Sequence, residues 1–421
     1  MRVAVIGAGI VGVTTAYELA ADGHEVTVFE RRSAVAAETS YANAGVIAPG
    51  YVTPWAAPGM PRKVLSQLFG RHAAVRFGGL SSLALAPWIW RWWRACAPAV
   101  YRRNRSAMQG LAHYSRQRLQ TLTDALRLDF EQASGYLVLL RRERELAAAQ
   151  PGLALLKDLG VTHALLDGAQ ARAVEPGLNP QQALAGAIHL PQDGVGNCRH
   201  FAHLLKAEAQ RLGAAFRFDH DVTQLQPGSR PRLDWAHRGA FGHGEFDAVI
   251  VCAGVQANAV LRGCGLQLPL APVHGYSITA PLRREDAGAV GPRSAVMDEQ
   301  FKVAVSRLGQ RVRVAGSAEL GGPLATVSAS GVATLYRVLD DWFPGAAQLR
   351  DVQVWKGARP MLPDGPPVLG ASGAPGVWLN LGHGSSGWAL SCGSARVLAD
   401  LLAGRPAEID LAGLDLQRLQ R

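Results

Sequence analysis

A glycine motif near the N-terminus constrains the fold more than any other feature of the sequence. Residues 2–6 form an apolar, β-branched run of the kind found in buried parallel strands, and the segment GAGIVG follows immediately at 7–12. Residues 14–21 are typical of a helix, and residues 25–29 predict a second strand that ends at Glu30. This order of strand, glycines, helix and strand predicts a βαβ unit that binds a dinucleotide.

Each glycine of the motif has its own physical role. Gly7 permits the tight turn, Gly9 lets a pyrophosphate approach the backbone, and Gly12 lets the helix pack closely on the strand. The N-terminus of the helix faces the phosphates, and Glu30 is placed to bind both hydroxyls of the adenosine ribose and to repel a 2′-phosphate. NADP is therefore disfavoured. The motif alone does not separate FAD from NAD, and a purely structural turn is the alternative for the glycines by themselves.

Length and composition predict a globular protein of two domains. One hydrophobic core seldom grows beyond about 250–300 residues, and this chain has 421 residues, of which 48% are hydrophobic and 18% charged. The N-terminus lacks the pattern of a signal peptide, and no apolar window is long enough to span a bilayer. We therefore expect an unprocessed, cytoplasmic protein.

Cysteines and charges exclude several classes of protein. The five cysteines are scattered and never form Cys-x-x-Cys, which argues against a disulfide framework and against a metal site, and favours a reducing compartment. The formal net charge is +10, but the arginines are dispersed, so no basic tract indicates a nucleic-acid partner. We expect this charge to attract anionic substrates or an anionic membrane surface.

Further glycine-rich blocks occur where ligand loops are expected. The segment ETSYANAG at 38–45 precedes Pro49-Gly50-Tyr51, and an apolar strand at 246–252 ends in Ala253-Gly254. Near the C-terminus, WKGARPMLPDG at 355–365 leads to GHGSSGW at 382–388 and then to a helical run through Leu402. Loops at the carboxyl ends of strands are the usual ligand sites of such sheets.

These blocks together resemble the D-amino acid dehydrogenases, within the wider family of amino-acid and amine oxidases that contains D-amino acid oxidase, glycine oxidase and sarcosine oxidase. The resemblance spans essentially the entire chain and also rests on Gly275-Tyr276-Ser277 and Lys302-Val303-Ala304. It implies an α/β fold in which a Rossmann-like FAD-binding domain is joined by a second, α+β substrate domain that covers the flavin. The expected FAD-binding domain comprises 1–50, 171–255 and 350–421, and the substrate domain 51–170 and 256–349.

The same resemblance assigns the cofactor site. The loop from Ser40 to Gly45 would run beside the flavin, and the GHGSSG turn would aim backbone N–H groups at the pyrimidine end of the ring, where they stabilise the charge of reduced flavin. Gly357 stands where sarcosine-type oxidases carry a flavin-bonding cysteine, so FAD should be non-covalent; Cys392 is interpreted as a core residue. The expected cofactor-binding residues are Gly7, Gly9, Ile10, Val11, Gly12, Glu30, Arg31, Arg32, Ser40, Asn43, Ala44, Gly45, Val222, Ala253, Gly254, Gly357, Gly382, His383, Gly384, Ser385, Ser386 and Gly387.

Arg359 is the main candidate for substrate binding. Its guanidinium matches a carboxylate in bidentate fashion, and it lies in the block that resembles the carboxylate-binding arginine of the family; a solvated surface arginine is the alternative. Tyr276 can donate a hydrogen bond to the substrate or shield it from water, with Tyr51 as a second tyrosine of the same kind, although both can equally be core aromatics. The resemblance adds Lys302 near flavin N5.

The mechanism that the resemblance implies is hydride transfer from a neutral amine to flavin N5. The imino acid then hydrolyses to a 2-oxo acid and ammonia, and a quinone or other carrier takes the electrons. No dedicated base is required, and His383 in a glycine turn is more often an element that orders the loop.

Three departures from the dehydrogenase pattern leave the substrate open. His274 stands in place of lysine, Phe301 in place of tyrosine, and Ser385-Ser386 in place of Thr-Leu. A secondary amine or imino acid of the sarcosine, glycine, proline or hydroxyproline type, oxidised by an oxidase or dehydrogenase, is therefore the alternative. A non-catalytic basic protein would have little need for the Arg359 and GHGSSG blocks.

The segment PWIWRWWR at 87–94 is the last unusual feature. A helix there would place both arginines on a different side from the bulky apolar residues, a pattern that suits peripheral contact with the inner face of the cell membrane. Packing of the tryptophans against the second domain is the equal alternative. The residues expected on the apolar side are Trp88, Ile89, Trp92 and Trp93.

Overall fold

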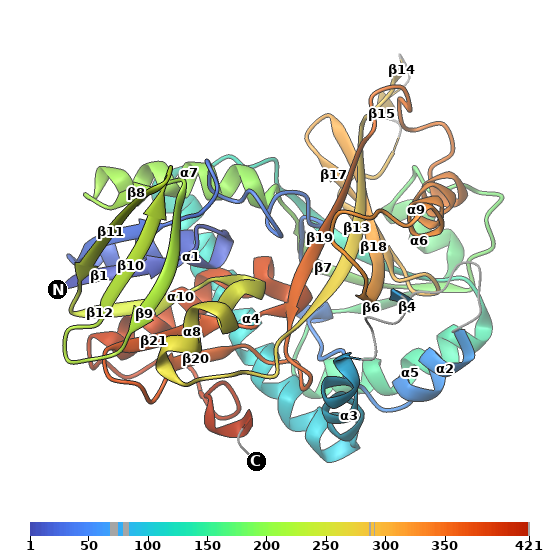
Figure 1. The fold of residues 1–421 in the computed structure, drawn as a ribbon. Helices are drawn as coiled ribbons and strands as arrows, with labels where there is room; N and C mark the ends of the chain where they lie inside the picture. The colour runs from blue at the N-terminus through green and yellow to red at the C-terminus, as the bar shows by residue number, and fades with distance from the viewer. Residues whose placement is uncertain (68–74, 79–83, 286–287, 290, 420–421) are drawn as a thin grey trace.

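The computed structural model describes residues 1–67, 75–78, 84–285, 288–289 and 291–419, and within them the chain is built around two large sheets (Figure 1). The first sheet has six strands in the order β20-β21-β12-β1-β2-β8, and all neighbours are parallel except β20 and β21. The strands are β1 (Arg2–Ile6), β2 (Glu25–Phe29), β8 (Ala215–Arg217), β12 (Ala248–Val251), β20 (Val368–Ala371) and β21 (Val377–Leu381).

The second sheet has ten strands in the described part of the chain. Its main path is β19-β13-β18-β17-β16-β5-β7-β3, with β4 beside β18 and β6 beside β7, and only the pairs β16–β5 and β4–β18 are parallel. The strands are β3 (Val46–Ile47), β4 (Val75–Gly78), β5 (Ala133–Leu140), β6 (Ala164–Leu166), β7 (Gly186–Val195), β13 (Ala271–Pro281), β16 (Ala295–Asp298), β17 (Val303–Leu308), β18 (Arg311–Gly321) and β19 (Gln353–Met361).

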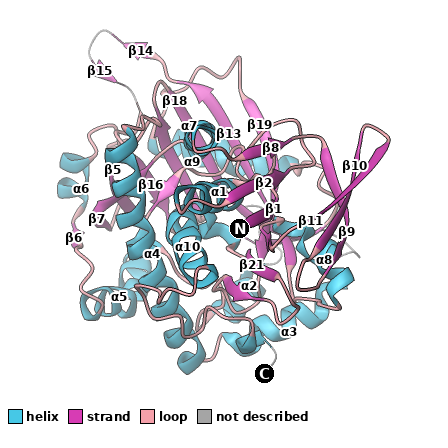
Figure 2. Ribbon diagram, turned by 90° about the vertical axis from the view of Figure 1, so that its left-hand side faces the viewer, coloured by secondary structure: helices cyan, strands magenta, loops and turns pink. Residues whose placement is uncertain are grey.

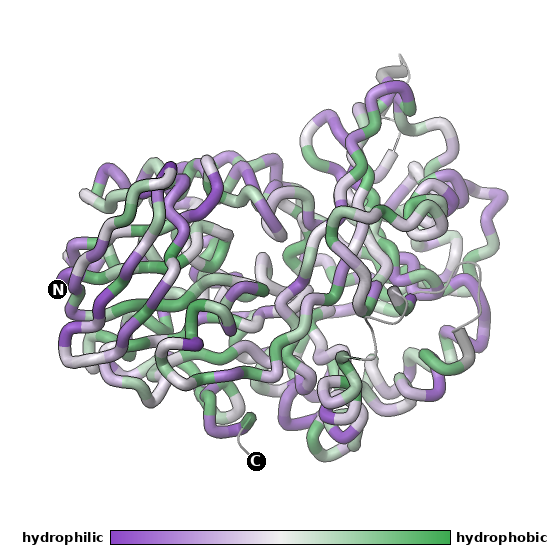
Figure 3. The backbone as a smooth tube through the Cα atoms, viewed as in Figure 1, coloured by the Kyte–Doolittle hydropathy of each residue, from purple (hydrophilic) through white to green (hydrophobic). Residues whose placement is uncertain are grey.

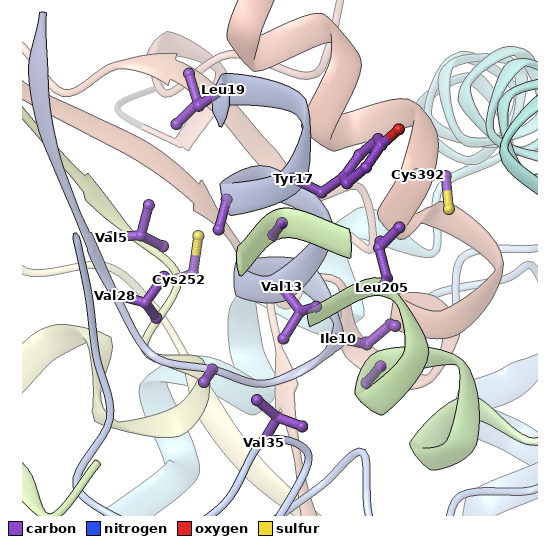
Figure 4. Packing of buried hydrophobic residues seen from close by; sticks show 14 of the residues in the cluster. Val5, Ile10, Val13, Tyr17, Leu19, Val28, Val35, Leu205, Cys252 and Cys392 are labelled. Carbon is purple, nitrogen blue, oxygen red and sulfur yellow. The ribbon is translucent and has the colours of Figure 1, made fainter. Parts of the chain in front are cut away.

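Alternation along the strands of the first sheet separates two cores. Val3 and Val5 pack on the side of the helices, whereas Ala4 and Ile6 pack on the side of a three-stranded sheet. Figure 2 shows α1, α10 and α4 side by side on the helix side of the first sheet. Figure 4 shows the hydrophobic core on this side. Figure 3 shows many hydrophilic positions on the outer helix α7. The elements are α1 (Ile10–Ala21), α4 (Pro98–Leu126), α7 (Cys198–Arg211), α10 (Gly387–Leu402), β9 (His220–Gln226), β10 (Arg232–His237) and β11 (Ala240–Glu245).

Helices also cover both faces of the second sheet. Helices α6 and α9 pack on the face that carries Leu137 and Leu139, and α3 and α5 pack on the opposite face. A hairpin of β14 (Arg284–Glu285) and β15 (Gly288–Ala289) lies apart from both sheets. The remaining helices are α2 (Met60–Gln67), α3 (Ala86–Ala95), α5 (Glu143–Asp158), α6 (Gly168–Val174), α8 (Ala257–Leu261) and α9 (Ala329–Trp342).

This architecture confirms the predicted Rossmann-like α/β fold with a second sheet-and-helix unit. The predicted βαβ unit is present, although its helix begins at Ile10 rather than at Thr14 because the glycine turn leads directly into it. Strands β3, β7 and β19 lie within the ranges expected for the FAD-binding domain but pair into the second sheet. Among the described residues, no helix combines the length and apolarity that a bilayer-crossing segment requires.

The tryptophan-rich segment forms α3, and its tryptophans differ in burial. Trp88 and Trp92 are buried one turn apart, whereas Trp93 is 54% exposed and Trp90 is 62% exposed. A residue follows the previous one by about 100° around a helix, so Trp93 lies beyond the edge of the buried stripe. All four expected residues, Trp88, Ile89, Trp92 and Trp93, nevertheless line one apolar hollow beside α3, so the expected apolar side is present.

A buried carboxylate joins three helices behind the first sheet. The Glu18 side chain of α1 is fully buried and accepts hydrogen bonds from Arg118 of α4 at 2.7 and 2.8 Å. Arg396 of α10 donates to Glu18 at 2.9 Å and also binds Asp22 and Asp400. Because a buried charge without partners costs several kcal/mol, on the order of 3–5, this network fixes how the three helices meet.

Asp193 anchors the short 3-10 helix η1 (Pro49–Tyr51) to strand β7. Its side chain, in a residue only 3% exposed, accepts hydrogen bonds from Gly50 N at 3.0 and 3.3 Å. Burial raises the pKa of Asp193 to about 7, more than the Gly50 hydrogen bonds lower it. The folded state therefore holds a proton on Asp193 at pH values where the unfolded chain releases it.

This raised pKa predicts how stability changes with pH. Between about pH 4 and pH 7 the folded state binds more protons at Asp193 than the unfolded state, so this group's contribution falls as pH rises. Asp193→Asn cannot ionise. Its free energy of unfolding, relative to that of the native chain, should therefore rise by on the order of 2–4 kcal/mol between pH 4.5 and pH 8. Thermal unfolding of both proteins at the two pH values measures this. The exposed variant Asp221→Asn should show no such difference, and a pH-independent effect of Asp193→Asn would contradict the assignment.

Candidate active site

The glycine turn after β1 is shaped by close backbone contacts. Gly7 has a φ of +102°, and a Cβ there would lie 2.7 Å from the carbonyl oxygen of Cys252. A Cβ at Gly12 would lie 1.9 Å from the carbonyl oxygen of Gly7. Both positions therefore require glycine so that α1 can begin directly against β1 and β12.

Gly9 is different, because the protein itself does not crowd it. A Cβ at this position would make only an ordinary 3.5 Å contact with Ser40 Oγ. Internal packing therefore gives no reason for glycine here, whereas a pyrophosphate against the N-terminus of α1 does. Ile10 N donates to Ser40 Oγ at 3.0 Å, and Val11 lies in the first turn of the helix.

Glu30 closes the other side of this turn at the end of β2. Its Oε2 accepts a hydrogen bond from Ala8 N and its Oε1 accepts one from Arg32 N, both at 2.7 Å. Burial raises the pKa of Glu30 above its usual value despite these hydrogen bonds. Arg31 and Arg32 both form ion pairs with Glu38. The carboxylate thus lies beside the glycine turn, as a ribose-binding group should.

The predicted flavin loop, from Ser40 to Gly45, joins the two sheets. Ser277 Oγ of β13 donates to the carbonyl oxygen of Ala42 at 2.8 Å, and Arg313 Nη1 of β18 donates to that of Asn43 at 3.1 Å. Asn43 Oδ1 accepts from Gly45 N at 2.9 Å, and the φ of Gly45 is +73°. Ala44 lies between them, so the second sheet directly fixes the shape of this loop.

Three further cofactor candidates, Ala253, Gly254 and Val222, lie after strand β12 and in strand β9. Gly254 has a φ of +53° and begins the 3-10 helix η3 (Gly254–Gln256), directly after Ala253. Strand β19 contacts both η3 and the 3-10 helix η5 (Gly384–Ser386). Val222 lies in β9 and packs in the core beneath Ala253.

The GHGSSG turn precedes α10, as predicted. Gly382 and Gly384 have φ values of +78° and +55°, and α10 begins at Gly387, directly after Ser385 and Ser386. His383 Nε2 lies 3.0 Å from Ser394 Oγ, and burial lowers the pKa of His383 to about 3. The imidazole is therefore neutral at physiological pH and hydrogen-bonded within the helix start.

Arg359 projects from β19 onto a surface of two glycines. A Cβ at Gly275 would lie 2.2 Å from Arg359 Nη2, and a Cβ at Gly357 would lie 1.8 Å from the Trp355 ring. Gly275 and Gly357 are paired in the register of β13 and β19. Side chains at these two positions would displace both the guanidinium and the indole, so the glycines form a flat floor under Trp355 and Arg359.

The charge of Arg359 has little compensation from the protein. Its Nη1 donates to the carbonyl oxygen of Ser317 at 2.9 Å, and among the described residues no carboxylate forms an ion pair with it. Burial lowers the pKa of Arg359 to about 10, which leaves the guanidinium charged at neutral pH. A partly buried cation without a counter-ion is suited to bind an anionic ligand.

Tyr51 and Lys302 are brought together, with a carboxylate that the sequence analysis missed. Tyr51 OH donates to Glu299 Oε2 at 2.8 Å, and Lys302 Nζ donates to Tyr51 OH at 3.0 Å and also to Glu299. Burial opposes ionisation of Glu299, but the charge of Lys302 and the hydrogen bonds outweigh it and lower its pKa. The spacing of three residues between Glu299 and Lys302 was the available signal.

Tyr276 lies on the other face of the second sheet. Its ring packs against α9, its hydroxyl donates to Glu319, and Lys356 Nζ donates to the same carboxylate at 2.9 Å. Ser277, the next residue, points the opposite way to Ala42. The structure therefore does not bring Tyr276 to Arg359.

Two of the three departures from the dehydrogenase pattern also lie away from Arg359. His274 shares the face of Tyr276, and its Nδ1 lies 3.2 Å from the carbonyl oxygen of Gly321. Phe301 packs in the core under α9, with Arg141 and Arg337 over its ring at 5.1 Å each. Only Ser385 and Ser386 border the cofactor region, at the start of α10.

Comparisons with known proteins agree over nearly the whole chain. A family model described as FAD dependent oxidoreductase matches residues 2–401. The D-amino acid dehydrogenase of Cereibacter sphaeroides is 43% identical over 421 residues, which cover 99% of this chain and 95% of the relative. That of Chromohalobacter salexigens is 40% identical and covers 99% of both chains.

Solved structures share the fold at lower identity. Glycine oxidase from Geobacillus kaustophilus has a TM-score of 0.77 at 23% identity and covers 99% of both chains. L-proline dehydrogenase from P. horikoshii has a TM-score of 0.73 at 16% identity, covering 100% of this chain and 98% of that one. Together with the full-length relatives and the family model, these findings show that the chain belongs to the family of FAD-dependent oxidoreductases that includes the D-amino acid dehydrogenases.

Proposed function

We propose that this enzyme oxidises a D-amino acid to a 2-oxo acid and ammonia, and passes the electrons to a quinone or another carrier. The observation that carries the proposal is the Arg359 guanidinium, which is charged, partly buried and without a carboxylate partner in the described chain. The full-length relatives named D-amino acid dehydrogenase support this choice of substrate. When bound, FAD supplies the hydride acceptor.

The chain's own residues determine how the substrate is held. The planar Arg359 guanidinium lies on the floor formed by Gly275 and Gly357, where it can bind a carboxylate through two N–H groups. Binding the carboxylate fixes one end of the amino acid, so that the α-carbon has a defined position. Trp355 covers the floor beside it and limits the space for water.

No side chain of this site needs to act as the base. His383 is buried and hydrogen-bonded to Ser394, and burial keeps its pKa at about 3, so it cannot take a proton at neutral pH without a large cost. We assign Tyr51 and Lys302, held by Glu299, to the wall of the substrate site, because they lie on the face of the second sheet that is turned away from α9. We assign Tyr276 a structural role, in which its hydrogen bond to Glu319 holds β13 against β18.

We place FAD along the carboxyl ends of the first sheet, with its pyrophosphate at Gly9 and its ribose at Glu30. The segments 1–50, 171–255 and 350–421 would hold it, and 51–170 and 256–349 would cover the ring. Attachment should be non-covalent, since Gly357 offers no nucleophile and any side chain there would meet Trp355.

The first prediction concerns the substrate itself. Under anaerobic conditions, D-amino acids should bleach the visible flavin absorbance of the purified protein, and L-enantiomers should not. Readmitted air should restore the colour slowly and a soluble quinone quickly. Bleaching only by sarcosine, proline or hydroxyproline would replace the D-amino acid with a secondary amine, and rapid recovery in air would make the enzyme an oxidase.

The second prediction concerns Arg359. Arg359→Leu removes the charged hydrogen bonds to the carboxylate, worth about 1.5–3 kcal/mol, and should raise KM roughly 10- to 100-fold. Arg359→Lys should lose less because it keeps the charge but not the bidentate geometry. The bound flavin spectrum should be unchanged in both variants. The exposed Arg230→Leu serves as the control, and unchanged steady-state kinetics in Arg359→Leu would remove this residue from the site.

We also propose that the enzyme contacts an anionic bilayer through the outer side of α3 and its neighbours. Trp93, Leu65 and Phe77 are 54%, 59% and 39% exposed and line an entirely apolar hollow. Trp90, on the same helix as Trp93, is 62% exposed. Arg91 and Arg94 are exposed on the same helix. Apolar rings with adjacent arginines match the boundary between acyl chains and anionic headgroups.

The third prediction tests this surface. The double variant Trp90→Ser/Trp93→Ser should bind vesicles of anionic phospholipid at least tenfold more weakly than the native protein, because both apolar anchors are lost. Phe241→Ser, at a side chain 84% exposed on β11, is the matched control and should bind normally. Co-sedimentation at low salt measures the difference. Equal binding by the double variant and the control would contradict the proposed surface.

A further inference from the structure

A second cavity is lined by side chains of α7 and of the strands β18 and β19 of the second sheet. Its volume is about 210 Å³, and five of its eight lining side chains are arginine or histidine. No acidic side chain is among the eight. The lining residues are Tyr41, Asn197, Arg199, His200, His203, Arg311, Arg313 and Gln353.

Arg313 is the most deeply buried charge of this cavity. The residue is 4% exposed, and its side chain is held by neutral groups, donating to Thr279 Oγ1 at 2.9 Å and to the carbonyl oxygen of Asn43 at 3.1 Å. Burial, and then the nearby charge of Arg311, lower its pKa to about 10. The neighbouring carboxylate of Glu131 is shared between Arg311 and Asn197. The cavity therefore keeps a net positive charge.

Arg199 adds a second cation at the first turn of α7. Its guanidinium lies over the Tyr41 ring at 4.2 Å, and its buried Nε has no hydrogen-bond partner among the described residues. Asn197 caps the helix by accepting from His200 N at 3.2 Å. The helix N-terminus adds to the positive potential, and among the described residues no carboxylate forms an ion pair with the Arg199 guanidinium.

We propose that this cavity is a binding site for a small oxyanion, a phosphate- or carboxylate-bearing metabolite distinct from the substrate at Arg359. Three guanidinium groups around one cavity, those of Arg199, Arg311 and Arg313, repel each other, and an anion among them would relieve that repulsion. The volume is below the roughly 300 Å³ at which clefts for drug-sized ligands begin, so a compact anion fits better than a nucleotide.

The site is connected to the flavin loop. Tyr41 lines the cavity, and Arg313 holds Asn43 of the loop from Ser40 to Gly45. An anion bound to Arg199 and Arg313 would therefore reduce the motion of the loop that borders FAD. A more ordered loop should hold FAD more tightly, so the anion should slow the release of FAD. Because coupling between the affinities of two sites is reciprocal, FAD should in turn strengthen anion binding. This inference rests on the FAD site and not on the identity of the oxidised substrate.

The test uses calorimetric titration of the FAD-loaded protein with inorganic phosphate and, separately, succinate, at constant ionic strength set by sodium chloride. At least one of the two should bind saturably with one site per chain. Arg199→Gln should weaken that binding about tenfold or more, because it removes a charged hydrogen bond. His203→Gln gives a second, independent variant at an exposed position. Arg211→Gln, at the far end of α7 and with a 72% exposed side chain, removes the same charge and should bind normally.

A second readout follows FAD itself. The bound anion should slow flavin release on dilution in the native protein and in Arg211→Gln, but not in Arg199→Gln. Binding of neither probe, equal weakening by Arg199→Gln and Arg211→Gln, or binding lost in Arg359→Leu but kept in Arg199→Gln would overturn the proposal. The last outcome would place the anion at the substrate site instead.

Discussion

The segment from Thr39 to Asn43 is the constraint on which the two halves of the molecule depend. It leaves the first sheet after β2, yet its hydrogen bonds go to Ala358, Ser277 and Arg313 of the second sheet. Ser40, in the same segment, accepts from the N-terminus of α1. One short stretch of chain therefore sets the position of the glycine turn relative to the sheet that carries Arg359, and few other residues act on both.

The glycines around this segment show that one motif can serve two purposes. Gly7 and Gly12 are required by the protein's own packing, since side chains there would meet backbone atoms. Gly9 faces no such obstacle, so the protein's own packing gives no reason for a glycine there. In the proposed function, this glycine lets the pyrophosphate approach the backbone. Within this six-residue motif, two glycines are required by packing and the third is assigned to the cofactor. The same residues therefore predict both the fold of this region and its cofactor.

The parts that the sequence predicts are those that depend on local order. The βαβ unit and the turn before α10 are each set by residues that are neighbours in the chain. Tyr276 and Arg359 are on different strands, and the face that each side chain takes depends on strand register, which one sequence does not reveal. Glu299 and Trp355 were missed for the same reason, because their partners are fixed only by tertiary packing.

The positions of the arginines in the fold differ from what their spacing in the sequence suggests. The arginines look dispersed along the chain, which correctly gives no sign of a basic tract, but residues 199, 311 and 313 meet around one cavity and residue 359 stands alone on a glycine floor. By contrast, Arg118 and Arg396 both pair with the buried Glu18, and Arg396 also pairs with Asp22 and Asp400. A net charge is therefore a poor guide to function until each cation is matched with its partner. Buried or partly buried cations without a carboxylate partner among the described residues, such as Arg359 and Arg313, are positions where an anionic ligand can bind favourably.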